Sequence, residues 1–297
     1  MSILSYSERG PWGDSQWRGN CSGHIYRELF ARVKPRFFID PMVGSGTSIE
    51  VARDMKIEAL GLDLHSGFNA IRDSILVRAG KPAELVVSHP PYGSMVTYSG
   101  EVWGEAHADD LSRCTDDADF HDKLQLVLLN QREATTVGGI YGVIIGDRSH
   151  DGRYTSYQAE CIARMPSDEL VTVLIKAQHA VRSQSSQYNP LRWPRISHEY
   201  ILLWRRRGSS LLVALGDIAR EQQSRMRATW RNIVRLAMIS GEPEAHLSEI
   251  YDRVALAAPE RIKTSEHWKA KVRQVLQTSG CFESTARGHW RLTEVVV

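Results

Sequence analysis

The sequence predicts an α/β fold, in which a parallel sheet carries helices on both faces and a smaller, mainly helical domain follows. Three observations predict it. A turn with two glycines, residues 40–47, connects the apolar run 37–39 to a helix-like stretch at 48–53. Apolar strand patterns then alternate with helical patterns as far as residue 206, as in parallel α/β sheets. The basic and Gly-Ser-rich stretch 205–210 separates this region from a tail in which helical patterns dominate.

The individual elements follow from the spacing of apolar residues, because short continuous runs indicate buried strands and helical spacing indicates amphipathic helices. Strands are expected at residues 37–39, 59–64, 84–87, 140–147, 170–175 and 198–204, and helices at 25–32, 48–53, 120–130 and 159–163. Residues 71–79 fit a helix or a strand–helix junction, and Gly138-Gly139 is expected to end the helical region before it. The polar stretches 93–120 and 178–197 are expected to be loops, the first of them solvated above the site.

Composition bounds the class of protein. A chain of 297 residues can hold one large domain and a small one, and 42% hydrophobic with 24% charged residues is ordinary for a soluble globular protein. The net charge of +2 does not by itself indicate binding to nucleic acid. From Gly208 onward, however, 13 Lys and Arg stand against 10 Asp and Glu, a net of +3, which leaves −1 for the rest. This asymmetry weakly favours a polyanionic partner for the tail.

Cysteine usage and hydropathy suggest a cytoplasmic protein. The four cysteines lie far apart without a C-x-x-C pair, so we expect reduced thiols, no zinc and no other bound metal. No apolar stretch approaches the roughly 20 residues that span a bilayer. The first six residues lack the basic-then-apolar pattern of a signal peptide, and we expect no membrane partner.

The turn at 40–47 is a candidate ligand site. Glycine lets a ligand lie against the backbone, and the first turn of the following helix offers unpaired N–H groups. No Gly-Lys-Ser/Thr closes the turn, so it is not a phosphate-binding P-loop. Asp63 ends the second strand about twenty residues later, where an acid can bind ribose hydroxyls or, alternatively, cap a helix.

A second motif makes the pattern specific. The apolar run 84–87 leads into Ser88-His89-Pro90-Pro91-Tyr92. An Asp-Pro-x-x-Gly-Ser-Gly-Thr turn followed by an x-Pro-Pro-Tyr turn resembles the DNA amino-methyltransferases, and the resemblance covers residues 9–206. It implies a Rossmann-like sheet, S-adenosyl-L-methionine (SAM) as methyl donor, and transfer to the exocyclic amine of adenine or cytosine in double-stranded DNA.

The resemblance also implies roles for particular residues. Cofactor-binding residues are expected to be Asp40, Pro41, Gly44, Gly46, Thr47, Asp63, Gly19, Asn20, Ser22 and Ser88. Asp40 is the candidate near the methionine amino group, with a turn-capping role as the alternative. Ser22 could instead be a simple N-cap of the lead-in helix.

The catalytic turn comprises His89, Pro90, Pro91 and Tyr92. The family uses the first position and the carbonyl after it to accept the two amino hydrogens, and the aromatic ring to stack on the extruded base. His89 departs from the usual Asp, Asn or Ser. A neutral histidine has one acceptor nitrogen and can take up a proton, but a protonated one cannot accept, so activity should fall at acidic pH. The rival interpretation is an altered site in which Ser88 or His89 only shapes the turn.

The tail at 208–297, after a catalytic domain at 1–207, is expected to resemble a winged helix. Helical patterns at 211–239, 248–254 and 266–276 precede a hairpin at 281–292. Candidate DNA-binding residues are Lys269, Lys271, Arg273 and Arg287. A packing or protein-interaction module is the alternative. Either this tail or the 178–197 loop would read the target sequence, and the tail is favoured.

Three functions compete: a DNA amino-methyltransferase, an RNA or protein amide N-methyltransferase, and a non-catalytic DNA-binding regulator with a degenerate methyltransferase shell. The winged-helix-like tail favours the first, with N6-adenine ahead of N4-cytosine mainly because it is the commoner product. Restriction–modification partners or a homodimer would be consistent with it.

Overall fold

The computed structural model describes residues 1–17, 19–92, 96–150, 153–179, 196–226, 230–242 and 244–293. The chain forms two compact units, Met1–Ile218 and Ala219–Val297. The division falls inside helix α6 (Leu211–Met226), whereas the sequence analysis put the boundary at 207/208. Most of the predicted 178–197 loop lies outside the described residues.

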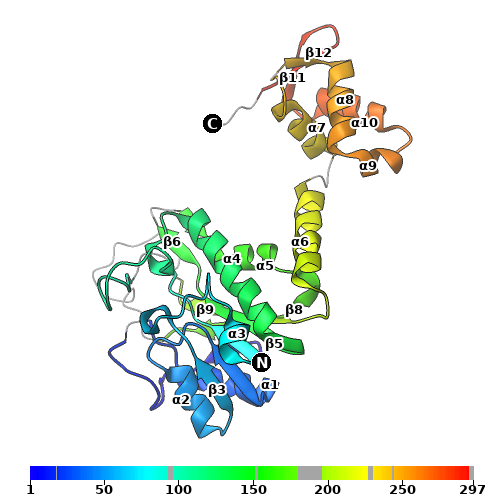
Figure 1. Ribbon diagram of the computed structural model, residues 1–297. Helices are drawn as coiled ribbons and strands as arrows, with labels where there is room; N and C mark the ends of the chain where they lie inside the picture. Colours follow the sequence, from blue (N-terminus) through cyan, green and yellow to red (C-terminus); the bar gives the residue numbers. More distant parts are fainter. Residues whose placement is uncertain are drawn as a thin grey trace. The chain divides into compact units, whose positions relative to one another are not determined.

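The N-terminal unit is built on a seven-stranded sheet in the order β1-β8-β9-β5-β4-β2-β3 (Figure 1). Its strands are β1 (Ile3–Ser5), β2 (Phe37–Asp40), β3 (Glu58–Gly61), β4 (Ala83–Ser88), β5 (Thr135–Ile145), β8 (Leu170–Ala177) and β9 (His198–Arg205). All neighbours pair in parallel except β9, which runs antiparallel to both β5 and β8. A separate hairpin joins β6 (Arg148–His150) to β7 (Arg153–Thr155).

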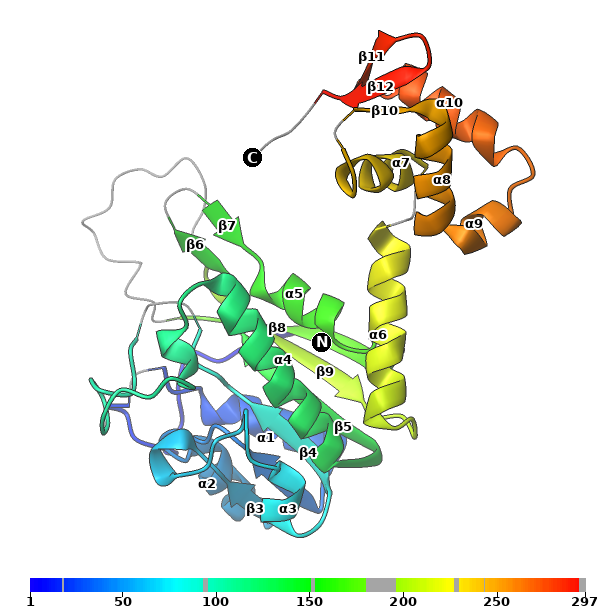
Figure 2. The same ribbon diagram turned by 45° about the horizontal axis from the view of Figure 1, so that its top comes forward.

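Helices cover both faces of this sheet, as Figures 1 and 2 show. The helices α1 (Gly23–Val33) and α2 (Thr47–Asp54) pack on one face, and α3 (Ile75–Ala79), α4 (Asp117–Ala134) and α5 (Tyr157–Arg164) pack on the other. Short 3-10 turns lie at Leu64–Ser66, Leu111–Arg113 and Ser167–Glu169. The predicted α/β, Rossmann-like fold is confirmed.

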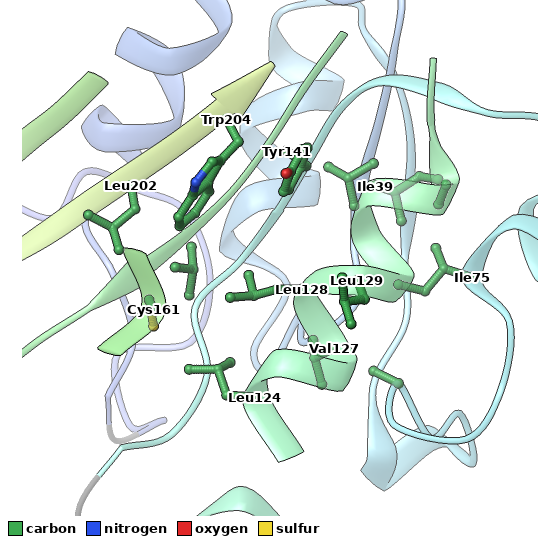
Figure 3. Close-up of a cluster of buried hydrophobic side chains, with 14 of the residues drawn as sticks. Ile39, Ile75, Leu124, Val127, Leu128, Leu129, Tyr141, Cys161, Leu202 and Trp204 are labelled. Carbon is green, nitrogen blue, oxygen red and sulfur yellow. The ribbon is translucent and has the colours of Figure 1, made fainter. Parts of the chain in front are cut away.

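Strand alternation divides the apolar residues between the two faces. On β5, Tyr141 and Val143 join the cluster beneath α4, while Ile140 and Ile144 join the cluster beneath α1. Figure 3 shows the first cluster, with the α4 side chains directed toward the ring of Trp204 and its neighbours. These rows of buried residues exclude water from both faces of the sheet.

One expected boundary was wrong. Gly138-Gly139 does not end the helical region, because α4 stops at Ala134 and β5 begins at the next residue. Gly138 has φ +82° and donates its N–H to the Arg206 carbonyl, while the N–H of Arg206 is donated to the Gly139 carbonyl. The two glycines therefore lie within β5, where its pairing with β4 is irregular between Thr135 and Ile140.

The C-terminal unit contains its own core and a three-stranded antiparallel sheet in the order β10-β12-β11. Its elements are α7 (Trp230–Ile239), β10 (Glu244–His246), α8 (Leu247–Ala257), α9 (Pro259–Lys263), α10 (Trp268–Thr278), β11 (Phe282–Ala286) and β12 (His289–Leu292). The predicted long helical stretch at 211–239 is two helices, α6 and α7. The predicted C-terminal hairpin is present as β11 and β12, and β10 adds the third strand, which the sequence analysis missed.

Candidate functional site

A cleft lies beside the carboxyl ends of β2, β3 and β4, the edge at which parallel α/β sheets bind ligands. Its empty volume is about 840 Å³, including space open to solvent. Both predicted turns contribute to its wall. Among the predicted site residues, those that line it are Gly19, Asn20, Pro41, Gly44, Thr47, Asp63, His89 and Pro91. The structure therefore brings segments from four distant parts of the sequence to one cleft.

The glycine turn has the backbone conformation that its sequence indicates. Gly44 and Gly46 have φ of +50° and +87°, in the left-handed region that favours glycine. A Cβ on Gly44 would lie 3.1 Å from the indole nitrogen of Trp17, so a side chain there would press on the wall of the cleft. Gly46 caps the start of α2 and does not itself line the cleft.

The N-terminal segment is fastened to this turn. Thr47 donates its hydroxyl to the side-chain oxygen of Asn20 at 2.5 Å, and the Gly13 N–H is donated to Glu50 on α2 at 2.8 Å. These bonds place Gly19 and Asn20 at the cleft. Ser22 lies outside it: its hydroxyl donates to the Glu8 carbonyl, and although it occupies the N-cap position of α1, its side chain makes no capping bond.

Two acidic residues lie at the ends of neighbouring strands: Asp40 is the last residue of β2, and Asp63 comes just after β3. Asp63 accepts hydrogen bonds from the N–H groups of Gly44 and His65, so it both caps the turn after β3 and faces the cleft. The Asp63 hydrogen bond raises the pKa of His65. Asp40 is almost completely buried and accepts from the Met42 N–H and the Ser48 hydroxyl. Burial raises the pKa of Asp40 to about 7, only partly offset by those two bonds.

The proline turn begins where β4 ends. Ser88 is fully buried and donates its hydroxyl to Gln131 on α4 at 3.0 Å, so it anchors the turn from behind. His89 and Pro91 face the cleft, while Pro90 and Tyr92 are not among its lining residues. The Tyr92 ring packs against Gly146 at the end of β5, where a Cβ would have no room.

Behind the proline turn lies a buried polar network that the sequence analysis missed. Glu199 on β9 is paired with Lys176 on β8, accepts the hydroxyl hydrogen of Tyr92, and lies 3.4 Å from Nε2 of His89. Cys21 borders both Lys176 and the cleft. The available signal was a lysine and a glutamate inside two otherwise apolar strand patterns, which is costly unless the charges meet.

An aromatic wall was also missed. Trp17 and Tyr98 stack with ring centroids 6.2 Å apart, and His65 lies 5.6 Å from Trp17 and 6.3 Å from Trp103. The three larger rings line the cleft beside the glycine turn. Aromatic faces of this kind suit a flat heterocycle or a cation.

The expectation of a solvated acidic loop at 93–120 was wrong for its middle. Asp109 and Asp110 are buried and line the cleft. Asp109 is paired with Arg72, and Asp110 accepts the N–H groups of Ser99 and Ser112. Asp110 therefore acts as a turn acceptor and Asp109 as a buried ion-pair partner, and net charge along the sequence reveals neither role.

In the C-terminal unit the predicted basic residues are exposed. Lys269 and Arg273 lie one turn apart on α10 and converge on Tyr251 of α8: the ammonium is 5.3 Å from the ring centroid, and the guanidinium donates to the hydroxyl at 3.2 Å. Lys271 is exposed on the same helix, and Arg287 occupies the turn between β11 and β12.

The part of the chain that the structure describes contains neither a candidate metal cluster nor a membrane-spanning helix. No cluster of His, Cys, Asp and Glu there is arranged to hold a metal ion. No helix within the same residues has the length and apolar character needed to cross a membrane.

Neither a protein-family model nor a curated protein matches the sequence. Several solved structures are similar. A candidate DNA modification methylase from Thermus thermophilus, in complex with SAM, is 24% identical with a TM-score of 0.30, and the match covers 48% of this chain and 54% of that one. TrmN from Thermus thermophilus is 13% identical with a TM-score of 0.38, covering 64% and 51%. A SAM-dependent methyltransferase from Clostridium acetobutylicum is 8% identical with a TM-score of 0.35, covering 66% and 94%.

This chain thus spans about half the length of the two Thermus proteins. Identities and TM-scores this low carry no function from those proteins to this chain.

Proposed function

We propose that this protein is a SAM-dependent DNA methyltransferase that modifies an exocyclic base amine, with N6-adenine favoured over N4-cytosine. One observation carries the proposal: the glycine turn after β2 and the His89-Pro90-Pro91 turn after β4 border the same cleft. A donor site and an acceptor site for one group must adjoin, because transfer needs the reacting atoms within contact distance.

The residues at the glycine turn suit the cofactor. Gly44 leaves open the space that a Cβ would fill, Asp63 offers carboxylate oxygens for ribose hydroxyls, and Trp17 and Tyr98 offer aromatic faces for adenine or the sulfonium. Bound there, SAM would supply the electrophilic methyl group.

The residues at the proline turn suit an amine. The lone pair of an exocyclic base amine is delocalised into the ring, and acceptors for its hydrogens favour the pyramidal, nucleophilic form. His89 provides an acceptor nitrogen beside the cleft, and Pro90, the next residue of the turn, is proposed to provide its backbone carbonyl. Tyr92 is proposed to stack on the extruded base, although in this structure its hydroxyl is bonded to Glu199 and its ring packs against Gly146.

The C-terminal unit is proposed as the DNA-reading module. Its element order, helix, strand, two helices, helix and hairpin, supports a winged helix with α10 as the recognition helix. Exposed Lys269, Lys271 and Arg273 on α10 and Arg287 at the hairpin turn would contact phosphates or base edges.

The decisive experiment measures binding and transfer separately. Calorimetry with SAM and S-adenosylhomocysteine should show one site, and tritiated methyl transfer should label duplex DNA but not tRNA. Mass analysis of the digested product then identifies the base. Binding without transfer to any nucleic acid or protein would indicate a non-catalytic regulator, and labelling of tRNA alone would contradict a DNA substrate.

The reading role of the C-terminal unit has its own test. The double variant Lys269→Ala/Arg273→Ala should weaken duplex affinity and lower the salt slope by about two, one for each lost phosphate contact. Lys263→Ala on α9, also an exposed lysine and paired with Glu260, is the matched control and should change neither quantity. Equal affinities for all three proteins would remove α10 from the interface.

A further inference from the structure

The network behind His89 is built across two strands. Glu199, the second residue of β9, stands directly opposite Lys176 on β8, and both side chains are nearly inaccessible to solvent. One carboxylate oxygen pairs with the Lys176 ammonium. The other accepts from the Tyr92 hydroxyl and faces Nε2 of His89 at 3.4 Å. Glu199 therefore links a buried cation to the histidine at the cleft.

Glu199 remains ionised in this setting. Burial by itself would raise the pKa of Glu199, but the Lys176 ammonium and His89 outweigh it and hold that pKa well below its usual range. An ionised carboxylate accepts hydrogen bonds and cannot donate one. Its presence beside Nε2 favours the hydrogen on that ring nitrogen, just as carboxylates that contact the far nitrogen of catalytic and metal-binding histidines fix their tautomers.

The opposite ring nitrogen then becomes the acceptor. In a neutral imidazole only one nitrogen carries hydrogen, so an Nε2–H tautomer leaves a lone pair on Nδ1. Within the residues that the structure describes, Nδ1 of His89 has no hydrogen-bond partner, and the side chain borders the cleft.

We propose that Glu199 is a positioning residue that holds His89 in its Nε2–H tautomer, so that Nδ1 accepts an amino hydrogen of the target base. The inference rests on the proposed methyl transfer and names the atom that performs it. The amine nitrogen bonds to the methyl carbon as the carbon–sulfur bond breaks, and sulfur keeps that electron pair. The surplus amine proton passes to Nδ1, and the resulting imidazolium faces Glu199 until it releases the proton to water.

The tautomer can be measured without any activity. In the full-length protein labelled with ¹⁵N-histidine, multiple-bond ¹H–¹⁵N spectra at pH 8 distinguish Nε2–H from Nδ1–H. His89→Asn identifies the resonance among the 11 histidines. We expect Nε2–H in the wild type and a mixed population in Glu199→Gln, because an amide both donates and accepts. Nδ1–H in the wild type, or an unchanged tautomer in Glu199→Gln, would overturn the proposal.

A matched control exists just before strand β8. Glu169 is also buried, pairs with a cation and accepts from a tyrosine hydroxyl, but its partners are Arg132 and Tyr141, and it does not border the cleft. Glu169→Gln should leave the His89 tautomer and kcat unchanged. Glu199→Gln should lower kcat by about 100-fold, because His89 is the acid–base group and loses the tautomer in which it accepts, while the affinity for S-adenosylhomocysteine should be unchanged.

A folding defect is separated from a positioning defect by a double variant. Glu199→Gln leaves the Lys176 charge unpaired, so Glu199→Gln/Lys176→Met removes both charges together. We expect this protein to fold, to bind S-adenosylhomocysteine and still to have low kcat. Wild-type kcat in the double variant would mean that Glu199 only balances Lys176. Failure of the wild type to methylate any substrate would instead refute the proposed function, and the tautomer result would stand independently.

Discussion

Two buried carboxylates lie beside opposite ends of strand β8 and have nearly the same chemistry but different surroundings. Glu169, just before the strand, accepts from Arg132, Tyr141 and the Arg207 N–H. Glu199, opposite Lys176 near the other end, accepts from Lys176 and Tyr92. About six residues of strand, on the order of 20 Å, separate the two clusters.

The two clusters differ in the cation that pairs with the glutamate and in the groups that contact this pair. Arg132 binds Glu169 with two nitrogens, and its guanidinium also donates to the Ser209 carbonyl, so the cluster fastens α4 to the segment after β9. Lys176 is a point charge that leaves one oxygen of Glu199 for Tyr92 and His89. The Arg132–Glu169 cluster therefore stabilises the fold, whereas the Lys176–Glu199 cluster places a negative charge beside the cleft.

The largest expected effect is on stability. Arg132→Met would leave Glu169 as a buried charge without its cation and should lower the free energy of unfolding by about 3–5 kcal/mol. Arg132→Met/Glu169→Leu, which removes both charges, should recover most of that loss. Urea denaturation followed by circular dichroism measures both. Methyl transfer per folded molecule should stay at the wild-type level, and a fall in kcat like that of Glu199→Gln would break the contrast between the two clusters.

Asp40 extends the comparison to a buried carboxyl without a cation. Its pKa is shifted in the opposite direction to those of Glu169 and Glu199. Its folded pKa of about 7 lies above the usual carboxyl value. The folded protein therefore holds the proton more tightly, and the associated stability is present below about pH 4 and is lost as pH rises to about 7.

Asp40→Asn should remove that loss, which is a few kcal/mol at about 1.4 kcal/mol for each pKa unit. Thermal unfolding of the ligand-free protein at pH 5 and pH 8 measures it: the stability difference between the two pH values should shrink in the variant. An identical difference in both proteins would show that Asp40 titrates normally. Glu169 and Glu199 oppose this trend, because their lowered pKa values add stability that disappears only in acid.

Replacement of His89 tests whether the residue that faces Glu199 takes part in methyl transfer. His89→Ala removes the acceptor at the cleft and should lower kcat by about 100-fold or more. His89→Asn keeps an acceptor oxygen and should retain part of the activity, while both variants should bind S-adenosylhomocysteine like the wild type. Turnover in His89→Ala equal to the wild type would refute the catalytic role and, with it, the importance of Glu199.

The sequence predicted the sheet and both turns, because these depend on local patterns. Apolar runs identified β2, β4, β5, β8 and β9, and glycine spacing identified the backbone around Gly44 and Gly46. The antiparallel pairing that places Glu199 opposite Lys176 joins residues 23 apart, and the bond from Tyr92 to Glu199 joins residues 107 apart. Such partners follow from register and topology, which no short window of sequence contains.

The aromatic wall could not be predicted for a similar reason. Trp17 belongs to an irregular N-terminal segment, and Tyr98 and Trp103 belong to a loop whose acidic composition indicated solvent exposure. Their common position depends on hydrogen bonds such as that from Thr47 to Asn20, which tie the first segment to α2. The tertiary fold, and not the local amino-acid composition, therefore places these rings at the cleft.

The smallest expected effect offers the closest comparison, since each cluster contains one tyrosine. Tyr92→Phe and Tyr141→Phe each remove one hydroxyl that donates to a buried glutamate, and each should cost about 1 kcal/mol of stability. Only Tyr92→Phe should also change transfer, by a few-fold in kcat, because Glu199 then loses a donor and its oxygen is freer to move from His89. Chemical denaturation and steady-state kinetics give both quantities for the pair. Equal kinetics in the two variants would mean that the Tyr92 hydroxyl, like that of Tyr141, serves the fold alone, and that orientation of His89 depends on Lys176 and Glu199 without it.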